Sequence, residues 1–426
     1  MRALKFIHAA DLHLDSPFKG VNSLPQAIRD RIRESTFTAL SRLVNIAVQE
    51  AVDFVLVSGD VYDLSDRSLR AQLRFLQAAE RLAEHGIRLF VIHGNHDPLS
   101  GARAKLNWPD LVHTFGSRQV ETVTVSNRAG EPIATVSGIS YEQSATTDNL
   151  AAQFPSPDPN LYAIAMLHTN VDGDEGHDNY APCSREQLLR AGYDYWALGH
   201  VHNRRVLSES PHIVYPGNIQ GRSARETGAK GCYLVEVDEQ GHATLSFRRT
   251  DTIEWTHQTV SIQGWSKEYE LKEGLEQAMQ RSQQEAEGSP VMLRLSLTGR
   301  GSLHQLLHNG AMLSELIDEL RELGQAHENF VWIASCKLET GAELPLELLF
   351  EQESLVGDLL RMSDDLLADE ARLLTFCREA CAPLLGHAKA ARLLQDMDPA
   401  LWKQQLLQAR ELAAEELLGE GVIDQS

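Results

Sequence analysis

The sequence has 426 residues, of which 42% are hydrophobic and 23% charged, a balance that excludes a disordered chain and favours two or three globular domains. Its formal net charge of −21 excludes nucleic-acid binding through a general basic surface, so a phosphate-containing substrate would need metal ions or a small arginine cluster. Because no apolar run approaches the roughly 18 residues that span a bilayer and the N-terminus is not typical of a signal peptide, we expect a cytoplasmic protein without a membrane segment.

The first 250 residues alternate short apolar strands with amphipathic helices. Strands are predicted at residues 5–9, 54–57 and 88–92, and the run at 54–57 is apolar throughout, as expected of a strand covered on both faces. Apolar side chains at helical spacing predict one helix that begins near Pro25 and another that ends near Gly86. Further strands are predicted at residues 133–136, 162–167, 195–198, 213–215, 232–237 and 244–248. The pattern indicates an α/β domain layered around central sheets.

Two further segments follow this domain. Residues 251–340 show strand and helix signals in the order β-α-β-α-β, which is typical of a small α+β domain. In residues 341–426 the strand signals stop, and Leu, Ala, Glu and Arg recur with helical spacing. The predicted organisation is therefore three-part, with domains at residues 1–250, 251–340 and 341–426.

Five short motifs stand at the C-terminal ends of predicted strands, where open α/β sheets hold their ligands. They are Asp11-Leu12-His13, Gly59-Asp60-Val61-Tyr62-Asp63, Gly94-Asn95-His96-Asp97, His168 and Gly199-His200-Val201-His202. Their side chains combine carboxylates, one amide and imidazoles, a set that suits Mn, Fe or Zn better than Mg or Ca. Each motif alone is compatible with an ordinary packed residue, and His93 is interpreted as structural. The five together favour a metal site.

The spacing within the motifs favours two metal ions rather than one. Asp11 and His13 lie two residues apart at a strand end, so both can turn to one face of the sheet, and His200 and His202 repeat this spacing. Asp60 follows a glycine, which lets the backbone approach a metal closely. A carboxylate there can bridge two ions about 3.5–4 Å apart, as in two-metal phosphoesterases.

This ordered series resembles that of the calcineurin-like metallophosphoesterases. Its finer form is similar to that of the SbcD-type and YhaO-like DNA repair exonucleases, as shown by His-Ala-Ala-Asp-Leu-His-Leu near the start and by Tyr215-Pro216-Gly217-Asn218 after the last histidines. The motif resemblance covers residues 1 to about 250. It implies a layered metallophosphoesterase core of central sheets flanked by helices, followed by a capping domain and a helical C-terminal region.

Carried over by motif, the resemblance implies two divalent ions, with Mn as the expected metal and Fe or Zn as alternatives. The side chains implied for the first ion are Asp11, His13, Asp60 and His202. The side chains implied for the second ion are Asp60, Asn95, His168 and His200. Asp60 would thus bridge the two ions, in agreement with the argument from its glycine neighbour.

The resemblance also implies roles beyond the metal ligands. His96 would lie over the scissile phosphate and protonate or orient the leaving oxygen, and Asp97 would hold the His96 ring by a hydrogen bond. Asp63 stands where some nucleases of the family have a histidine. Arg222 and Arg225 follow the Pro-Gly-Asn segment and are candidates for contact with the nucleic-acid backbone, with solvation at the surface as the alternative.

The expected function is a Mn-dependent DNA exonuclease that hydrolyses phosphodiester bonds and serves as the nuclease subunit of a repair complex. DNA and an SMC-like coiled-coil ATPase are the expected partners, and a homodimer is allowed. Residues 341–426 would dock this ATPase or, alternatively, pack on their own chain. Two other functions stay open: a phosphatase or cyclic-nucleotide phosphodiesterase on the same core, and a non-catalytic scaffold for the ATPase. The long extension argues against the former, and the complete ligand set argues against the latter.

Overall fold

The protein is described by a computed structural model that covers residues 2–18, 24–63, 68–101, 104–127, 129–173, 178–308, 310–325, 328–386, 390–391, 394 and 397–423. The chain forms two compact units. The first consists of Met1–His257, Met279–Arg294 and Arg321–Ser335, and the second of Gln258–Ala278, Leu295–Leu320 and Cys336–Ser426. The domain boundaries predicted after residues 250 and 340 stay predictions.

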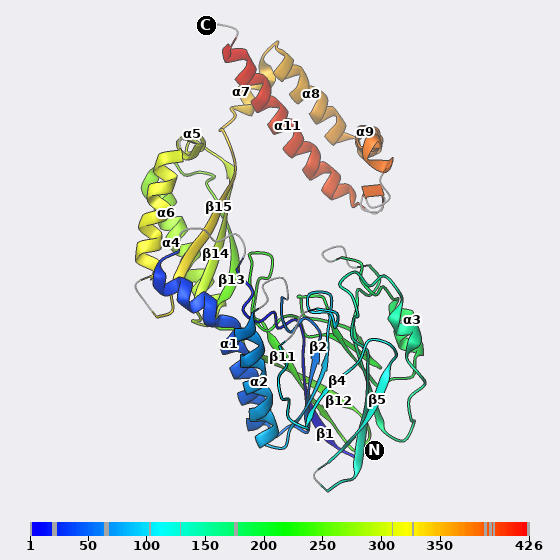
Figure 1. Cartoon of the computed structure of the whole chain (residues 1–426). Coiled ribbons are helices and arrows are strands. Elements are labelled where there is room, and N and C mark those ends of the chain that lie inside the picture. The colour runs from blue at the N-terminus through cyan, green and yellow to red at the C-terminus, as the bar shows by residue number, and fades with distance from the viewer. Residues whose placement is uncertain are drawn as a thin grey trace. The chain divides into compact units, whose positions relative to one another are not determined.

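The first unit contains two six-stranded sheets, and the first of these runs in the order β12-β11-β1-β2-β3-β4. Its strands are β1 (Leu4–Ala9), β2 (Phe54–Ser58), β3 (Arg88–Ile92), β4 (Val112–Thr114), β11 (Gly231–Val237) and β12 (Ala243–Arg249). Strands β1 to β4 are parallel, whereas β11 pairs with β1 in the antiparallel direction. Helices α1 (Gln26–Gln49) and α2 (Leu69–Glu84) run along its outer face (Figure 1).

The second sheet runs in the order β5-β6-β7-β8-β10-β9. Its strands are β5 (Glu121–Ser126), β6 (Pro132–Gly138), β7 (Tyr162–His168), β8 (Tyr195–Gly199), β9 (Arg205–Glu209) and β10 (His212–Tyr215). Strands β6, β7, β8 and β10 are parallel to one another. The short helices η2 (Leu150–Gln153) and α3 (Arg185–Arg190) pack on its outer face, where Leu150 and Leu188 join buried hydrophobic side chains of β7 and β8.

The two sheets share an aromatic core, and the alternation of side chains along β2 explains how it forms. Phe54 and Leu56 point into the core between the sheets, while Val55 and Val57 point the other way, toward α1 and α2. The ring of Phe6 on β1 meets the ring of Tyr195 on β8 edge-on, with 5.2 Å between their centroids. The β2 strand is buried at every residue, which confirms the prediction from its continuous apolar run.

The remaining elements form a third sheet and a set of helices. The sheet has the order β13-β14-β15, with strands β13 (Glu254–Ser261), β14 (Val291–Arg300) and β15 (Val331–Gly341). The helices that accompany it in sequence are α4 (Glu268–Glu285), α5 (His304–His308) and α6 (Gly310–Gln325). The order of strands and helices agrees with the small α+β segment predicted from the sequence.

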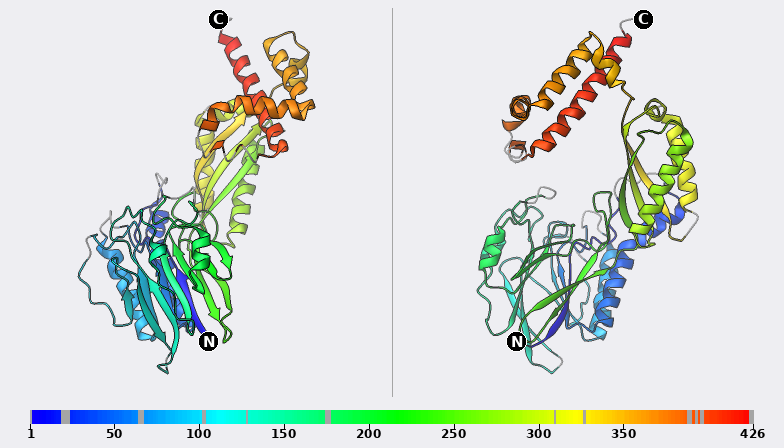
Figure 2. Two further views of the ribbon diagram at one scale, coloured as in Figure 1. Left: turned by 90° about the vertical axis from the view of Figure 1, so that its right-hand side faces the viewer. Right: turned by 180° about the vertical axis from the view of Figure 1, so that it is seen from behind.

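From residue 346 onward the described chain is helical, as predicted. The elements are α7 (Leu346–Glu351), α8 (Leu355–Ala368), α9 (Glu370–Ala380), η3 (Ala382–Gly386) and α11 (Pro399–Ile423). Helices α8 and α11 lie side by side (Figure 2) and share a small core around Leu360 and Ala414. None of the described helices is both long and apolar enough to cross a membrane. The α/β fold with a helical C-terminal region is confirmed.

Candidate dinuclear metal centre

The strand ends of both sheets converge and bring the predicted metal ligands together. The first sheet contributes, after β1, β2 and β3, the residues Asp11, His13, Asp60 and Asn95. The second sheet contributes, from the end of β7 and after β8, the residues His168, His200 and His202. Among the described residues, three groups have ligand atoms that all lie within 4.8 Å of one another, and these are Asp11-His13-His202, Asp11-Asp60-His168 and His13-Asp63-His96; the first two contain only predicted ligands. The site therefore exists only because the two sheets are packed together.

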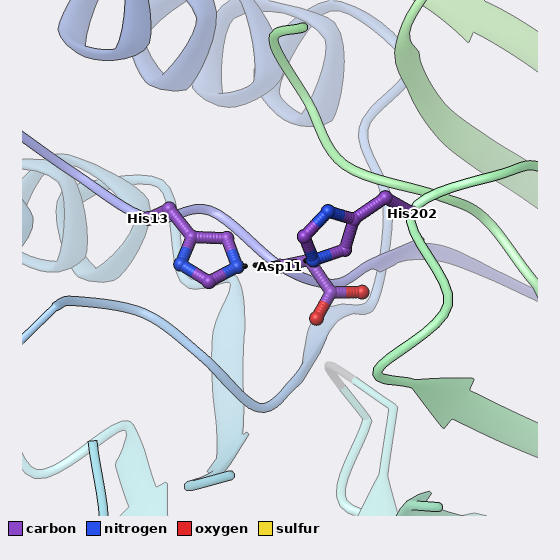
Figure 3. Close-up of side chains that lie close together, drawn as sticks. All are labelled: Asp11, His13 and His202. Atoms are coloured by element: carbon purple, nitrogen blue, oxygen red, sulfur yellow. Dashed lines mark hydrogen bonds between the residues drawn. The ribbon is translucent and has the colours of Figure 1, made fainter. Parts of the chain in front are cut away.

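In the first group, two imidazoles face each other beside one carboxylate (Figure 3). His13 Nε2 lies 3.3 Å from His202 Nε2, close to the Asp11 carboxylate. The Nδ1 atom of each ring lies beside a carboxylate, so each Nδ1–H donates and each Nε2 keeps its lone pair. Burial lowers the pKa of His13 and lowers the pKa of His202 to about 4, so both rings are neutral at pH 7. Two lone pairs directed at one point suit a shared cation.

The second group is built around Asp60 and His168. His168 Nε2 lies 3.4 Å from Asp60 Oδ2 and 3.1 Å from Asn95 Oδ1, and His200 Nδ1 lies 3.2 Å from the same amide oxygen. Asp60 Oδ2 is also 3.7 Å from His13 Nε2. The Asp60 carboxylate thus lies between the two groups, in the position expected of a bridge.

The buried carboxylates of these groups need a nearby positive charge to be stable in the ionised form. Burial raises the pKa of Asp11 to about 7, because its charged form is poorly solvated. Burial also opposes ionisation of Asp60, but His168 and His13 hold the pKa of Asp60 below its usual range. Burial lowers the pKa of His168, yet the Asp60 and Asp11 carboxylates outweigh this and raise it to about 9. A divalent cation would supply the same positive charge and displace the His168 proton, so the donor set fits a metal.

The backbone at the site is held in an unfavourable conformation. Asp11, His13, Asp60 and His200 have φ angles of 51°, 42°, 49° and 100°, in the left-handed region that L-residues other than glycine rarely adopt. Such conformations cost on the order of 1–3 kcal/mol each and persist where the surrounding structure enforces them, most often at functional sites.

Two glycines, Gly94 and Gly199, allow the strand ends of the two sheets to approach each other closely. A Cβ atom at Gly94 would lie 2.4 Å from Asp60 Oδ1 and 2.6 Å from His168 Nε2. A Cβ atom at Gly199 would lie 1.8 Å from the Ser58 carbonyl oxygen, so no other residue fits between β2 and β8. These glycines of the predicted motifs therefore have a packing reason that the sequence alone did not reveal.

The partner of His96 differs from the one expected. The His96 ring places Nδ1 2.6 Å from Asp63 Oδ1, whereas the resemblance implied a hydrogen bond with Asp97. Asp97 accepts hydrogen bonds from the backbone of Val61 and Gly94 and lies 2.7 Å from His93 Nδ1. The Asp97 carboxylate accepts from these backbone donors and so holds the loop after β3 in place. The Asp63 carboxylate contacts His96.

The two predicted arginines differ in their surroundings. The guanidinium of Arg222 is 12% exposed, donates to Ser16 Oγ at 2.9 Å and lies 3.5 Å from Asp63 Oδ2. It thus contacts a carboxylate behind the site, and its contact with substrate stays a prediction. Arg225 is exposed.

One residue of the site was missed from the sequence. Glu226 Oε1 lies 2.7 Å from His202 Nδ1, and no motif or spacing marks this residue, which comes 24 positions after the histidine that it orients. Its only signal was indirect, because it follows the Tyr-Pro-Gly-Asn segment by a few residues.

The fold and the site together define a metallophosphoesterase, and comparisons with known proteins agree. The chain belongs to the calcineurin-like phosphoesterases, whose family model matches residues 4–204. A second model, described as the middle domain of metallophosphoesterase YhaO, matches residues 255–341. The chain is 41% identical over 344 residues to the uncharacterized metallophosphoesterase YhaO of Bacillus subtilis, covering 80% of this chain and 83% of that protein. The predicted family is confirmed.

Two more distant relatives carry names from DNA metabolism. The chain is 26% identical over 251 residues to the DNA double-strand break repair protein Mre11 of Sulfurisphaera tokodaii, covering 55% of this chain and 60% of that protein. It is 22% identical over 278 residues to a subunit of the nuclease SbcCD of Bacillus subtilis, covering 57% of this chain and 68% of that protein. The chain thus spans less than two thirds of the Mre11 relative.

Proposed function

We propose that this chain is a Mn-dependent DNA exonuclease and the nuclease subunit of a repair complex with an SMC-like ATPase. The observation that carries the proposal is the contrast in exposure at the site. The His13 and His168 side chains are fully buried beside Asp60, whereas the His96 side chain is 46% exposed. Buried imidazoles suit ions, and an exposed one beside them suits a substrate. The names of the Mre11 and SbcCD relatives support DNA as that substrate.

The proposed ion-binding residues are those implied by the resemblance. Asp11, His13 and His202 would hold one ion, Asn95, His168 and His200 the other, with Asp60 shared. When bound, two such ions offset the charge of a phosphodiester and activate water for in-line attack. This compensation matters in a protein with a net charge of −21.

His96 would protonate the leaving oxygen of the scissile phosphodiester. Burial disfavours the protonated ring, but the adjacent Asp63 carboxylate and the nearby Asp60 raise the pKa of His96 above its usual value. A protonated, partly exposed imidazole fixed at Nδ1 by Asp63 leaves Nε2 to donate its proton. Asp97 would help to position His96 by holding the loop that carries it. The exposed Arg225 would contact the DNA backbone.

The helical region supports the proposed partner. Large apolar side chains with exposed fractions between 43% and 68% are distributed over its helices, and these are Leu348, Leu355, Met362, Phe376, Leu401, Leu412 and Leu384. Exposed apolar surface of this kind is typical of a protein-binding region, and an amphipathic partner such as a coiled coil would cover it. The same surface is compatible with a homodimer.

An assay of several phosphate esters tests the proposal. The chain, supplied with Mn²⁺, is incubated with end-labelled single- and double-stranded DNA, with bis(p-nitrophenyl) phosphate, and with p-nitrophenyl phosphate and cyclic AMP. We expect the DNA to be shortened progressively from an end, and the Asp60→Asn variant to be inactive. Hydrolysis of the monoester or of cyclic AMP with intact DNA would replace the proposal by a phosphatase or cyclic-nucleotide phosphodiesterase. A complete lack of hydrolysis by the Mn²⁺-loaded chain would favour a scaffold.

A further inference from the structure

A third cluster of candidate ligands adjoins the proposed metal centre and is not used by either proposed ion. Asp63 Oδ1 lies 2.6 Å from His96 Nδ1 and 3.3 Å from His13 Nδ1. The three side chains form a group whose ligand atoms all lie within 4.8 Å of one another. The rings of His13 and His96 meet edge-on, with 4.9 Å between their centroids. Two imidazole nitrogens therefore flank a single carboxylate oxygen.

The Asp63 carboxylate is oriented so that one oxygen faces the two imidazoles. Its Oδ2 accepts a hydrogen bond from Ser16 Oγ and lies 3.5 Å from Arg222 Nη1. Arg222 Nη1 also donates to Ser16 Oγ at 2.9 Å, so these two residues together hold Oδ2. This arrangement leaves Oδ1 for the two rings. Because the side chain is only 11% exposed, it can present this oxygen to an ion with little reorganisation.

His96 makes the cluster accessible to ions in solution. Its side chain is 46% exposed, whereas the side chain of His13 is fully buried. The backbone N–H of His96 donates to Asp60 Oδ1 at 2.9 Å, which fixes the main chain beneath the exposed ring. An ion can therefore approach the ring from solvent while the rest of the site stays in place.

Two imidazoles and one carboxylate are a common ligand set for zinc. Zn²⁺ binds such ligands at about 2.0–2.2 Å, so two ligand atoms of one tetrahedral ion stand about 3.3 Å apart. His13 Nδ1 and Asp63 Oδ1 already have this separation, and a small rotation of the exposed His96 ring would open the shorter one. Both rings would release their Nδ1 proton to solvent, because the metal takes the lone pair of that nitrogen. His13 would then bridge, with Nδ1 toward the new ion and Nε2 toward the proposed centre.

We propose that Asp63, His96 and His13 form a third ion position, which binds Zn²⁺ when this metal is in excess and thereby inhibits hydrolysis of DNA. This inference rests on the proposed function, in which His96 donates a proton to the leaving oxygen. The ion replaces the proton on His96 Nδ1 and leaves a neutral imidazole, which is a weaker acid than the protonated ring. The third ion is bound weakly and leaves on dialysis, so protein prepared without excess metal carries only the first two.

Zinc binding by the full chain tests the third ion position without reference to activity. Chelator-treated protein, isotope-labelled at histidine for NMR, is equilibrated with rising concentrations of free Zn²⁺, and the bound zinc per chain is measured. We expect two equivalents to bind first and a third at higher concentration, with the signals of the His96 ring shifting only as the third binds. Signals that shift with the first two equivalents, or that never shift, would overturn the proposal. If no zinc binds at all, the proposed metal centre itself fails, and that outcome is distinct.

Two histidine variants separate this position from ordinary binding at the surface. His96→Ala should lose the third equivalent and keep the first two. The matched control is His242→Ala, because His242 Nδ1 lies 3.3 Å from Asp238 Oδ2 in an exposed carboxylate–imidazole pair outside the metal centre. This control should bind three equivalents as the wild type does. Retention of the third equivalent by the His96 variant, or its loss from the His242 variant, contradicts the assignment.

Hydrolysis of two substrates tests the inhibition. Mn²⁺-loaded protein is given increasing Zn²⁺ with DNA or with bis(p-nitrophenyl) phosphate, whose leaving group needs no proton. We expect the rate on DNA to fall by about 10²–10⁴-fold, to the rate of His96→Ala, while the rate on the small diester falls far less. Zinc should not inhibit His96→Ala further.

The same assay separates the failure of this inference from that of the proposed function. An equal fall on both substrates would mean that zinc acts by replacing the two proposed ions, and the inhibitory role of the third position would be wrong. If the Mn²⁺-loaded chain hydrolyses neither substrate before zinc is added, the proposed function fails, and the inhibition of DNA hydrolysis fails with it.

Discussion

The metal centre and the helical region from residue 346 to 423 differ in which side chains they bury. At the metal centre, charged and polar side chains such as Asp11, Asp60 and His168 are buried, and the glycine-lined strand ends enforce their positions. In the helical region, large apolar side chains such as Leu355 and Met362 are exposed. Both arrangements cost stability in an isolated chain, and the proposed function gives each region a binding partner: ions in one, a protein surface in the other. We therefore expect changes in the two regions to separate hydrolysis from partner binding.

The largest effect is expected at the bridging carboxylate. Asp60→Asn replaces the shared charge by a neutral amide, so at least one ion should be lost and hydrolysis abolished. Treatment of the wild type with a chelator should have the same effect, with Mn²⁺ restoring activity better than Mg²⁺ because imidazoles dominate the ligand set. Elemental analysis and hydrolysis rates check both results. Asp53→Asn is the matched control at the other end of β2, where the carboxylate accepts from the Lys5 backbone N–H, and it should retain both ions.

A smaller effect on rate, with no effect on metal content, is expected at His96. His96→Ala removes a positioned acid, and such groups contribute about 10²–10⁴-fold, so DNA hydrolysis should fall by this factor. Bis(p-nitrophenyl) phosphate has a leaving group that needs no proton, so its hydrolysis should fall far less. The exposed His85 is the control, since His85→Ala should change neither rate. If the His96 variant loses its ions, His96 is a ligand and the comparison of buried ligands with an exposed acid is wrong.

The smallest effect on hydrolysis is expected in the helical region. Leu355 is 68% exposed, so Leu355→Lys should change the free energy of unfolding by no more than about 0.5 kcal/mol and leave hydrolysis intact, while it weakens binding of the proposed ATPase. Leu360 on the same helix is 2% exposed, so Leu360→Ala should cost about 2–5 kcal/mol in the stability of this region. Denaturation and co-purification with the ATPase distinguish the two. Deletion of residues 343–426 should likewise leave metal binding intact, and loss of the ions by a folded truncated chain would contradict this separation.

Sequence patterns predicted the strands that are buried on both faces and missed three strands at sheet edges, although the edge strands β12, β13 and β15 were predicted. The continuous apolar run of β2 was predicted because two layers cover it. Strands β4, β5 and β9 at sheet edges were missed because their sequences, Val-His-Thr, Glu-Thr-Val-Thr-Val-Ser and Arg-Val-Leu-Ser-Glu, carry polar or exposed residues. An edge strand is specified by its neighbour as much as by its own composition.

The site was predictable where a short motif carries both ligand and turn, and not where contacts depend on distant chain segments. Asp11, His13 and Asp60 come within a few residues of the ends of their strands, so their position in the motif places them at the site. Asp97 is adjacent to His96 in the sequence, yet its carboxylate turns to backbone donors, and Asp63 from another strand end meets the ring. Glu226 illustrates the same limit, since only the folded segment after β10 brings it to His202.

The aromatic contact between the two sheets has a consequence for the spacing of the candidate metal ligands. Phe6 on β1 lies five residues before Asp11, and Tyr195 on β8 lies five residues before His200, so the rings that meet at 5.2 Å also determine how far apart the two ligand-bearing strand ends stand. A thinner or thicker pair of side chains would alter the separation of ligands contributed by opposite sheets. Because cores adjust to volume changes by small backbone shifts, a substitution such as Phe6→Leu can change the distance between the candidate ligands without touching them. The interior of the sandwich thus sets the spacing of the candidate metal ligands, and hydrophobic residues outside the site contribute to its geometry.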